Sequence, residues 1–237
     1  MATWIGTSGY NYPEWRGSFY PPKTPTAKML PYYAERFTTV EINYTFYHAP
    51  TVKILEGWSA QTPPGFLFTL KAPKRITHDA RLRECADNLR YFTETAAKLG
   101  SKLGVLLFQL PPYFRKDLGA LDEFLAAYPA GMRAAFEFRH RSWLDEEVYA
   151  RLRARDLALC VADSEKMSTP VEITARYGYF RLRDEGYTPQ DIERWAQTIR
   201  EKTPQCSDVY VYFKHEEAGT GPQFARLLRE ALDAARA

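Results

Sequence analysis

The chain has 237 residues, of which 45% are hydrophobic and 26% are charged, and its formal net charge is +3. This balance is typical of a globular protein that can bury a sizeable core, and the mild charge permits an anionic partner without requiring nucleic acid. No window approaches the ~18 consecutive apolar residues of a membrane span, and the three scattered cysteines argue against a disulfide framework or a Cys-rich zinc site.

The cysteines and the first residues predict the compartment in which the protein works. Cys85, Cys160 and Cys206 are odd in number and far apart in sequence, which suits a reducing cytoplasm. Residues 1–6 lack the basic and apolar regions of a signal peptide and lead directly into a strand-like segment. We therefore expect a cytoplasmic protein without a membrane segment, and the sequence leaves its oligomeric state open.

Short apolar runs alternate with longer amphipathic stretches along the chain. Several of the runs are rich in Val, Ile, Leu and Phe with little polar alternation, as expected of parallel strands that are covered on both faces. The predicted strands are residues 4–8, 39–43, 66–71, 103–110, 134–138, 157–162, 177–182 and 208–213.

The segments between these runs have helical spacing. Apolar residues recur at i, i+3 and i+4 over residues 81–99, and Thr188 followed by Pro189 is typical of a helix start. The sixth connection contains Pro170 and leaves room only for a short or irregular helix. The predicted helices are residues 81–99, 118–128, 145–155, 189–202 and 222–235.

Eight strands that alternate with helices predict one α/β fold. Parallel strands joined by right-handed crossovers close a barrel when there are eight such units, whereas a doubly wound sheet usually needs five or six. No Gly/Ser-rich linker or charge run divides the chain. We therefore predict a single (β/α)8 TIM barrel over residues 1–237, with its functional site at the C-terminal ends of the strands.

A polar or charged residue lies near the end of almost every predicted strand. Side chains alternate across a strand, so Glu41 points opposite to Val40 and Ile42, and the same alternation holds on the fifth and seventh strands. If the apolar side chains face the helices, the polar ones converge inside the barrel mouth. The polar set is Ser8, Glu41, Asn43, Lys71, Gln109, Glu137, Arg139, Asp163, Arg181 and Arg183.

The charged members of this set allow two interpretations. Three carboxylates and four cations can neutralise one another as a structural plug of the barrel. Charges at a barrel mouth serve a ligand or a reaction more often, so we favour a functional site. The carboxylates are Glu41, Glu137 and Asp163, and the cations are Lys71, Arg139, Arg181 and Arg183.

These residues predict an enzyme that acts on a phosphorylated or otherwise anionic substrate, such as a nucleotide or a nucleic acid. An arginine fork holds phosphate bidentately, so Arg139 and Arg181 are expected to be the main anion contacts. Glu41 or Glu137 is expected to be the general acid–base, with Asp163 or His78 assisting. The other candidate site residues are Ser8, Tyr10, Asn43, Tyr47, Lys71, Gln109, Trp143 and Arg183.

Two rival functions fit the same residues. A non-catalytic nucleic-acid-binding barrel would use the same cations and aromatic rings, and its affinity would fall steeply with salt. A barrel that binds a small sugar or carboxylate would carry isomerase or lyase chemistry instead. Aromatic side chains in the loops, such as Tyr10, Tyr47 and Trp143, either stack on bases or sugars or cap the barrel core.

The four histidines lie in the loops that follow the strands. None has the spacing of a metal-binding motif, so we predict no metal and no cofactor, with a divalent metal as the lesser alternative. Each is better interpreted as a hydrogen-bonded residue at or behind the surface. The histidines are His48, His78, His140 and His215.

Lys71 also allows two interpretations. A lysine in a barrel mouth can form a Schiff base when desolvation or neighbouring cations lower its pKa. Glu41 on the adjacent strand is expected to raise the pKa of Lys71 instead. We therefore predict an ion pair between Glu41 and Lys71 rather than a nucleophilic amine.

Taken in order, these motifs resemble those of the YecE-like family, long catalogued as a domain of unknown function, over essentially the whole chain. Together they form a highly specific set. The matching motifs are Ile5-Gly6-Thr7-Ser8-Gly9-Tyr10 with Trp15 and Phe19-Tyr20, Val40-Glu41-Ile42-Asn43-Tyr44-Thr45-Phe46-Tyr47, Lys71-Ala72-Pro73 with Ile76-Thr77-His78, Phe108-Gln109-Leu110-Pro111-Pro112, Phe136-Glu137-Phe138-Arg139-His140 with Ser142-Trp143, Ala162-Asp163-Ser164, and Tyr210-Val211-Tyr212-Phe213.

The resemblance implies a TIM barrel, in agreement with the number of predicted strands, and no established activity. The likeness of that family to endonuclease IV-like barrels implies nucleic-acid or phosphodiester chemistry by fold analogy alone. Two late loops depart from the family's pattern. Arg183-Asp184-Glu185-Gly186 stands where relatives often carry His-Gly, and Lys214-His215 stands where they often carry Asn.

Overall fold

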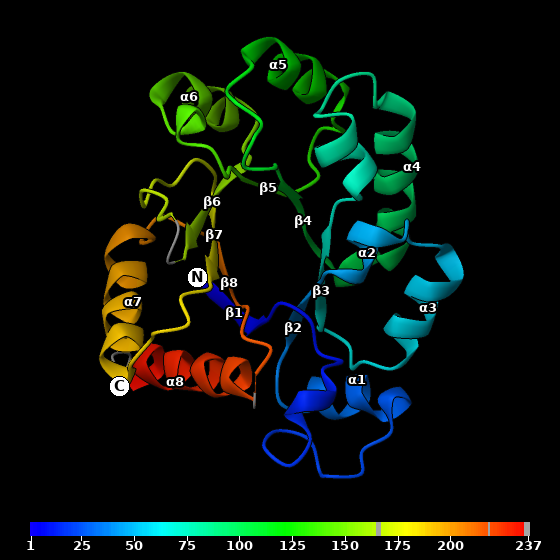
Figure 1. Cartoon of the computed structure of the whole chain (residues 1–237), viewed down its shortest axis with the longest axis vertical. Coiled ribbons are helices and arrows are strands. Elements are labelled where there is room, and N and C mark those ends of the chain that lie inside the picture. Colours follow the sequence, from blue (N-terminus) through cyan, green and yellow to red (C-terminus); the bar gives the residue numbers. More distant parts are fainter. Residues whose placement is uncertain (165–166, 218, 235–237) are drawn as a thin grey trace.

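The computed structural model describes residues 1–164, 167–217 and 219–234. Within them, strands alternate with helices and form one parallel sheet in the order β1-β8-β7-β6-β5-β4-β3-β2 (Figure 1). The strands are β1 (Ala2–Thr7), β2 (Thr39–Ile42), β3 (Leu67–Lys71), β4 (Leu103–Gln109), β5 (Ala134–Glu137), β6 (Ala158–Asp163), β7 (Tyr177–Leu182) and β8 (Asp208–Phe213).

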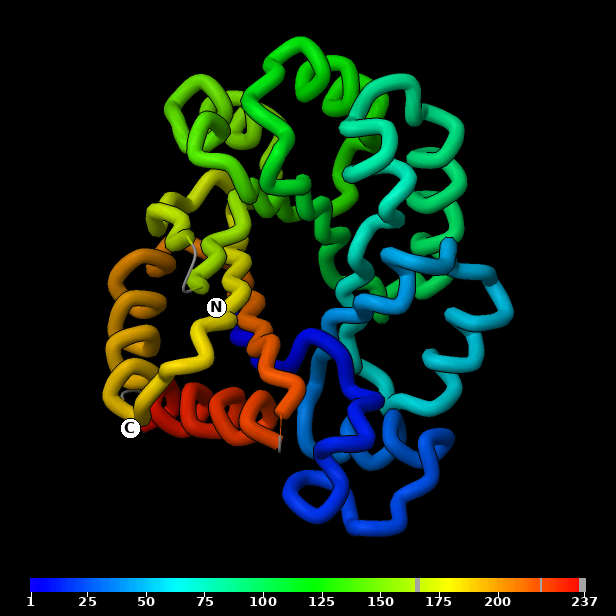
Figure 2. Tube along the Cα trace, in the orientation of Figure 1, coloured from blue at the N-terminus to red at the C-terminus, as the bar shows by residue number. Residues whose placement is uncertain are grey.

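The first and second strands complete the ring at their carboxyl ends. Ser8 and Glu41 form a parallel bridge just beyond β1, and the Gly9 amide donates to the Glu41 carbonyl oxygen over 2.7 Å. Figure 2 traces the chain once around the ring, so that β1 lies beside β8. The sheet is a nearly closed barrel, and the prediction of a (β/α)8 TIM-barrel fold is confirmed.

Helices surround the strands (Figure 1). No helix in the described part of the chain is long and apolar enough to cross a bilayer. The helix predicted over residues 222–235 begins two residues earlier, and residue 235 lies outside the described residues. The helices are α1 (Thr26–Ala34), α2 (Tyr44–Tyr47), α3 (Val52–Ala60), α4 (Ala86–Ala96), α5 (Leu118–Ala127), α6 (Glu146–Ala154), α7 (Pro189–Lys202) and α8 (Thr220–Ala234).

The helix predicted over residues 81–99 begins later than its apolar spacing indicates. Arg81, Leu82 and Glu84 have φ angles of 49°, 67° and 46°, which belong to the left-handed region and cannot continue an α-helix. The described residues between β6 and β7 form no helix, where the sequence predicted a short or irregular one around Pro170. The helices α1 to α3 were not predicted. Pro31 in the interior of α1 argues against a helix there, and α2 is only a single turn.

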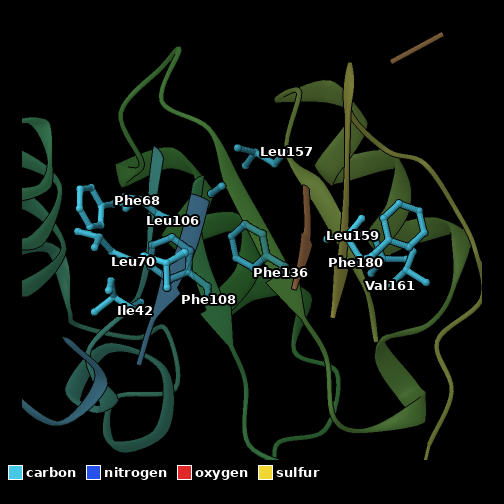
Figure 3. Packing of buried hydrophobic residues seen from close by; sticks show 14 of the residues in the cluster. Ile42, Phe68, Leu70, Leu106, Phe108, Phe136, Leu157, Leu159, Val161 and Phe180 are labelled. Carbon is cyan, nitrogen blue, oxygen red and sulfur yellow. The ribbon is translucent and has the colours of Figure 1, made fainter. Parts of the chain in front are cut away.

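Buried side chains form two apolar layers. The outer layer lies between the strands and the helices and includes Ile42, Phe68, Leu70, Leu106, Phe108, Phe136, Leu159, Val161 and Phe180 (Figure 3). The inner layer fills the barrel and includes Val105, Leu107, Ala158, Cys160, Ala162, Tyr177, Tyr179, Tyr210 and Tyr212. Residues of alternate phase on one strand therefore belong to different layers, as the pleat requires.

Tyrosines from the last two strands form hydrogen bonds across the inner layer. The Tyr212 hydroxyl crosses the barrel to lie 2.7 Å from Thr39 Oγ1 and 2.9 Å from Thr69 Oγ1. The Tyr177 hydroxyl donates to the Ala134 carbonyl oxygen over 2.8 Å. The barrel interior is thus a packed floor, and the polar groups at the strand ends lie above it.

Candidate functional site at the barrel mouth

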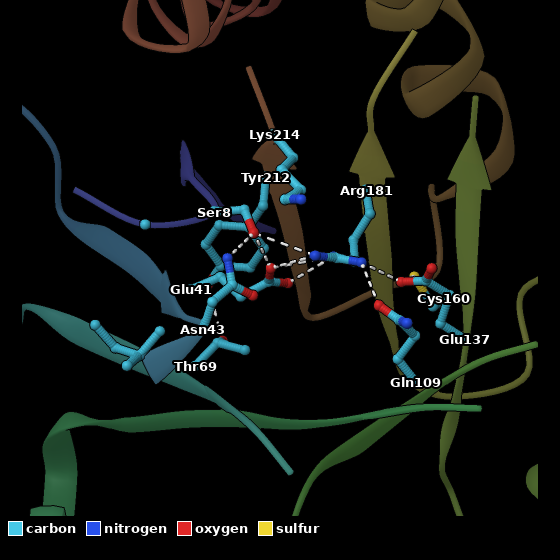
Figure 4. Close-up of polar contacts among 12 residues, drawn as sticks. Ser8, Glu41, Asn43, Thr69, Gln109, Glu137, Cys160, Arg181, Tyr212 and Lys214 are labelled. Atoms are coloured by element: carbon cyan, nitrogen blue, oxygen red, sulfur yellow. Dashed lines mark hydrogen bonds and ion pairs between the residues drawn. The ribbon is translucent and has the colours of Figure 1, made fainter. Parts of the chain in front are cut away.

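Arg181 of β7 lies at the centre of a buried ion network with Glu41 of β2 and Glu137 of β5 (Figure 4). Its Nε and Nη2 donate to the carboxylate of Glu41 over 2.8–3.1 Å, and its Nη1 donates to Glu137 Oε2. Arg181 is 1% exposed, and both glutamates are fully buried. We call these three residues the buried ion network. This geometry confirms the prediction that the side chains of Glu41, Glu137 and Arg181 point into the barrel.

Neighbouring side chains complete the hydrogen bonding of this network. Ser8 Oγ donates to Glu41 Oε1, and the Tyr179 hydroxyl donates to Glu41 Oε2 over 2.5 Å. Arg139 Nε donates to Glu137 Oε1 over 2.5 Å. Every carboxylate oxygen of the two glutamates therefore accepts at least one hydrogen bond, as buried charges require.

The network holds its charges ionised. Burial alone would raise the pKa of Glu137, but the guanidiniums of Arg181, Arg139 and Arg183 outweigh it and hold that pKa well below its usual range. Burial would lower the pKa of Arg181, yet Glu137 and Glu41 hold it well above its usual range. A carboxylate in this state is poorly suited to take up a proton at neutral pH, which weakens the assignment of Glu137 as general base.

Lys71, the last residue of β3, does not pair with Glu41. Its Nζ lies 4.1 Å from the centroid of the Phe46 ring, and none of the described carboxylates forms an ion pair with it. Burial first, and then the charge of Arg181, lower the pKa of Lys71 to about 7. The predicted ion pair and the predicted rise in pKa are both wrong, because the guanidinium of Arg181 takes both carboxylate oxygens of Glu41.

Besides Arg181, four cationic side chains line a cavity of about 410 Å³ above the buried ion network, which we call the central cavity. Lys71 ends β3, Arg139 follows β5, Arg183 follows β7 and Lys214 follows β8. We call these four residues the cationic rim. Glu216 is the one carboxylate among the residues that line this cavity in the described part of the chain.

The cationic rim is only partly neutralised. Arg139 pairs with Glu137 of the buried ion network, and Lys214 Nζ lies 3.5 Å from a carboxylate oxygen of the half-exposed Glu216. Arg183 Nε, in contrast, is buried and has no hydrogen-bond partner among the described residues. Burial and then Arg139 lower the pKa of Arg183, and burial and then Arg183 lower the pKa of Lys214. These cations oppose one another's charge, so an anion placed among them would be stabilised.

His78 lines the same cavity beside Lys71. Its ring packs edge-on against Phe46 with centroids 4.9 Å apart, and its Nδ1 lies 2.9 Å from Thr77 Oγ1. Burial and then the charge of Lys71 lower the pKa of His78 to about 4. The imidazole is therefore neutral at pH 7. The cavity also receives three other predicted site residues, Asn43, Tyr47 and Gln109.

Two further hollows share residues with the cationic rim. Arg139 and Arg183 also line a cavity of about 700 Å³ together with His140. Arg183 and Lys214 line another of about 520 Å³, which several carboxylates border. Arg183 thus lies on the wall of all three cavities.

An aromatic cleft of about 310 Å³ lies between the segments that follow β1 and β2. Tyr10, Tyr12, Tyr44 and Trp58 line it together with Asn43. Tyr12 and Asn43 also line the central cavity, so the two hollows are neighbours. Asn43 Oδ1 is buried and has no hydrogen-bond partner in the described part of the chain. Tyr10 is thus placed beside the mouth rather than within it.

Two predicted site residues point away from the mouth. The Asp163 carboxylate accepts from the Tyr187 hydroxyl over 2.8 Å and lines a separate hollow beside α7. Ala162 occupies the inner face of β6, so Asp163 has the outer phase. Trp143 is fully buried in the outer layer and stacks on Phe138 with centroids 4.9 Å apart. The expectations that Asp163 and Trp143 face the mouth are wrong.

Sequence reasoning did not place Lys214, Phe46 or Tyr12 in the site. A signal for Lys214 was present, because it continues the inward phase of Tyr210 and Tyr212 past the end of β8. Phe46 and Tyr12 lie in connecting segments, where strand phase gives no information. Among the described residues, no three His, Cys, Asp or Glu side chains gather in an arrangement that could hold a metal ion.

Comparisons with known proteins agree on one family. The model of the family described as "Protein of unknown function DUF72" matches residues 4–237. The UPF0759 protein YunF of Bacillus subtilis (strain 168) is 26% identical over 269 residues, covering 97% of this chain and 94% of YunF. The UPF0759 protein YecE of Escherichia coli (strain K12) is 32% identical over 138 residues, which span 58% of this chain and about half (48%) of YecE.

Solved structures agree with the fold. The crystal structure of a DUF72 family protein from Thermotoga maritima MSB8 has a TM-score of 0.88 at 25% identity, covering 98% of this chain and 100% of that chain. A DUF72 family protein from Enterococcus faecalis V583 has a TM-score of 0.82 at 17% identity, covering 98% of this chain and 95% of that chain, and supports the fold alone. None of these names assigns a substrate or a reaction.

Proposed function

Because the chain belongs to the DUF72 family of proteins of unknown function, as its resemblance to YecE-like proteins predicted, we infer its function from the geometry of the barrel mouth. We propose that it is an enzyme that acts on a phosphorylated or otherwise anionic substrate. The substrate binds in the cavity that the cationic rim surrounds, at the carboxyl ends of the strands.

One observation carries this proposal. Four cations from four different strand ends line one cavity beside Arg181. Of these four, Lys71 and Arg183 form no ion pair with a described residue, because Arg181 and Arg139 engage the two buried glutamates. The buried unpartnered Nε of Arg183 is a donor that an anionic oxygen can satisfy. A structural plug would instead pair its charges within the barrel, as the buried ion network does.

The structure changes the roles that the sequence predicted for individual residues. Arg139, Arg183 and Lys214 are proposed to bind the anion, in place of Arg181, whose guanidinium is committed to two carboxylates. Lys71, with a pKa of about 7, is proposed to be the side chain that reacts with the bound substrate. His78 contributes a neutral imidazole to the same wall.

Binding of a nucleic acid without catalysis is a second candidate function. The aromatic cleft favours it, because Tyr10, Tyr44 and Trp58 offer ring faces on which a base can stack beside the cationic cavity. In that case affinity falls steeply with salt, and substitution of His78, whose imidazole is neutral at pH 7, leaves the affinity nearly unchanged.

The experiment is calorimetry and thermal shift with inorganic phosphate, ribose 5-phosphate, a nucleoside monophosphate and short single-stranded DNA. We expect a phosphorylated ligand to stabilise the wild type. Each charge-assisted contact to an arginine contributes roughly 1.5–3 kcal/mol. The double variant Arg139→Ala/Arg183→Ala should therefore bind at least about 100-fold more weakly.

The matched control is Arg90→Ala/Arg226→Ala, which removes two exposed arginines from α4 and α8 and leaves the cavity intact. It should bind as the wild type does. The proposal fails if no phosphorylated ligand stabilises the wild type, or if the double variant in the rim binds as well as the control.

A further inference from the structure

Lys71 differs from the other lysines whose contacts the structure describes. Lys74, Lys116 and Lys214 each lie beside a carboxylate, and Lys102 Nζ donates to two backbone carbonyl oxygens over 2.7 and 2.8 Å. The amine of Lys71 has neither kind of partner among the described residues. Its Nζ lies over the face of the Phe46 ring, 4.1 Å from the centroid, and this ring accepts no proton and forms no covalent bond.

The groups that face Lys71 explain why its amine is not held as an ammonium. The carboxylates of Glu41 on β2 and Glu137 on β5 act to raise the pKa of Lys71, but both are bound by Arg181 on β7. Arg139 after β5 adds a further positive charge. Burial and these cations together outweigh the carboxylates and lower the pKa of Lys71 to about 7, so a large fraction of the amine is unprotonated at neutral pH.

We propose that Lys71 is a nucleophile that forms an imine with a phosphorylated aldehyde or ketone bound in the central cavity. This inference rests on the proposed function, because the cationic rim must hold the phosphate while the carbonyl carbon reaches Lys71 Nζ. Both groups line the same cavity of about 410 Å³, which is large enough for a small phosphorylated sugar or ketone.

The chemistry balances without an oxidant or a metal. The Nζ lone pair forms a bond to the carbonyl carbon, and the carbonyl π electrons move to oxygen, which takes up a proton to give a carbinolamine. The nitrogen loses a proton to water, and the hydroxyl takes up a further proton from water. The hydroxyl then leaves as water while the nitrogen lone pair forms the C=N bond, which gives the protonated imine. The protonated imine withdraws electrons from the neighbouring C–H and C–C bonds, which enables isomerase or lyase reactions.

The experiment traps this imine. The full chain is incubated with dihydroxyacetone phosphate, reduced with borohydride, and digested for peptide mass spectrometry. We expect one reduced adduct on Lys71, formed at least tenfold faster than on Lys74 or Lys98, which are exposed. Its rate should rise with pH through about 7 and then level off, because only the unprotonated amine attacks.

Two variants and a second ketone separate the outcomes. Lys71→Arg keeps a positive charge and should give no adduct at this position, and Lys71→Met provides the same comparison if the arginine does not fit. Dihydroxyacetone, which lacks the phosphate, should react with Lys71 at least tenfold more slowly than its phosphate ester.

The results distinguish the imine from the anion site. If phosphate stabilises the protein and Lys71 gives no adduct, or gives one no faster than Lys98, the imine is refuted and the anion site stands. If both ketones label Lys71 rapidly and equally, the imine stands and the phosphate contact in the proposed function is refuted.

Discussion

The buried ion network and the cationic rim lie next to each other at the mouth of the same barrel, yet they differ in how completely their charges are paired. In the network, Arg181 is matched by two glutamates, and every carboxylate oxygen accepts a hydrogen bond. In the rim, Lys71 has no ionic partner and Arg183 has a buried nitrogen without an acceptor, within the described residues.

This difference indicates what each group of residues does. A matched network gains little from a ligand, because a new anion would have to displace a carboxylate that is already well placed. A group of cations that is only partly neutralised, as the rim is, is unfavourable in the empty protein and becomes favourable when an anion binds. The cationic rim lowers the stability of the empty protein, and it is therefore the group of residues to examine for function.

The largest effect is expected from breaking the buried ion network. Glu41→Gln leaves the buried guanidinium of Arg181 with one full counter-ion instead of two, and loss of a buried partner costs roughly 3–5 kcal/mol. The free energy of unfolding, measured by urea titration at pH 7, should fall by about that amount. Glu216→Gln, in the exposed pair with Lys214, should change it by less than about 0.5 kcal/mol. Equal effects of the two substitutions would show that the network is not buried as described.

The opposite sign is expected when the rim loses a cation. Lys71→Met removes a half-buried charge that has no ion-pair partner among the described residues and keeps an apolar stem against Phe46. The unfolding free energy at pH 6 should therefore rise, on the order of 1–3 kcal/mol. The folded-state pKa of Lys71 is lowered from 10.5 to about 7, so the penalty is fully present below pH 7 and vanishes as pH rises towards 10.5. The gain should shrink over that range. A loss of stability at pH 6 would mean that Lys71 has a partner.

The alternation of apolar and polar residues was sufficient to predict the barrel and the inward direction of Glu41, Glu137 and Arg181. It could not predict the partners. The alternation along a strand shows which face of the sheet a side chain occupies, but not which side chain it contacts. Arg181 contacts Glu41 across a separation of 140 residues. No local pattern in the sequence favours that contact over one between Glu41 and Lys71 on the next strand. The longer and bidentate guanidinium decided the pairing.

Predictions for residues at the edges of strands were less accurate. Asp163 was assigned to the mouth because it follows an apolar run, but Cys160 and Ala162 occupy the inner phase of β6 and leave Asp163 on the outer one. Trp143 lies in a short turn of helix after β5, where strand phase no longer applies, and it packs in the outer layer. Phase is informative mainly while the strand lasts, although Lys214 keeps the inward phase of Tyr210 and Tyr212 one residue past the end of β8.

The central claim is that the rim is only partly neutralised by carboxylates and therefore binds an anion, and the pKa of Lys71 tests this claim most directly. Nuclear magnetic resonance of lysine side chains, with Lys71→Met to assign the signal, gives this value with and without saturating phosphate. We expect a pKa of about 7 in the free protein and a clear rise when phosphate binds, because the anion favours the charged amine. A pKa near the ordinary lysine value in the free protein, or one that phosphate leaves unchanged, would contradict the account.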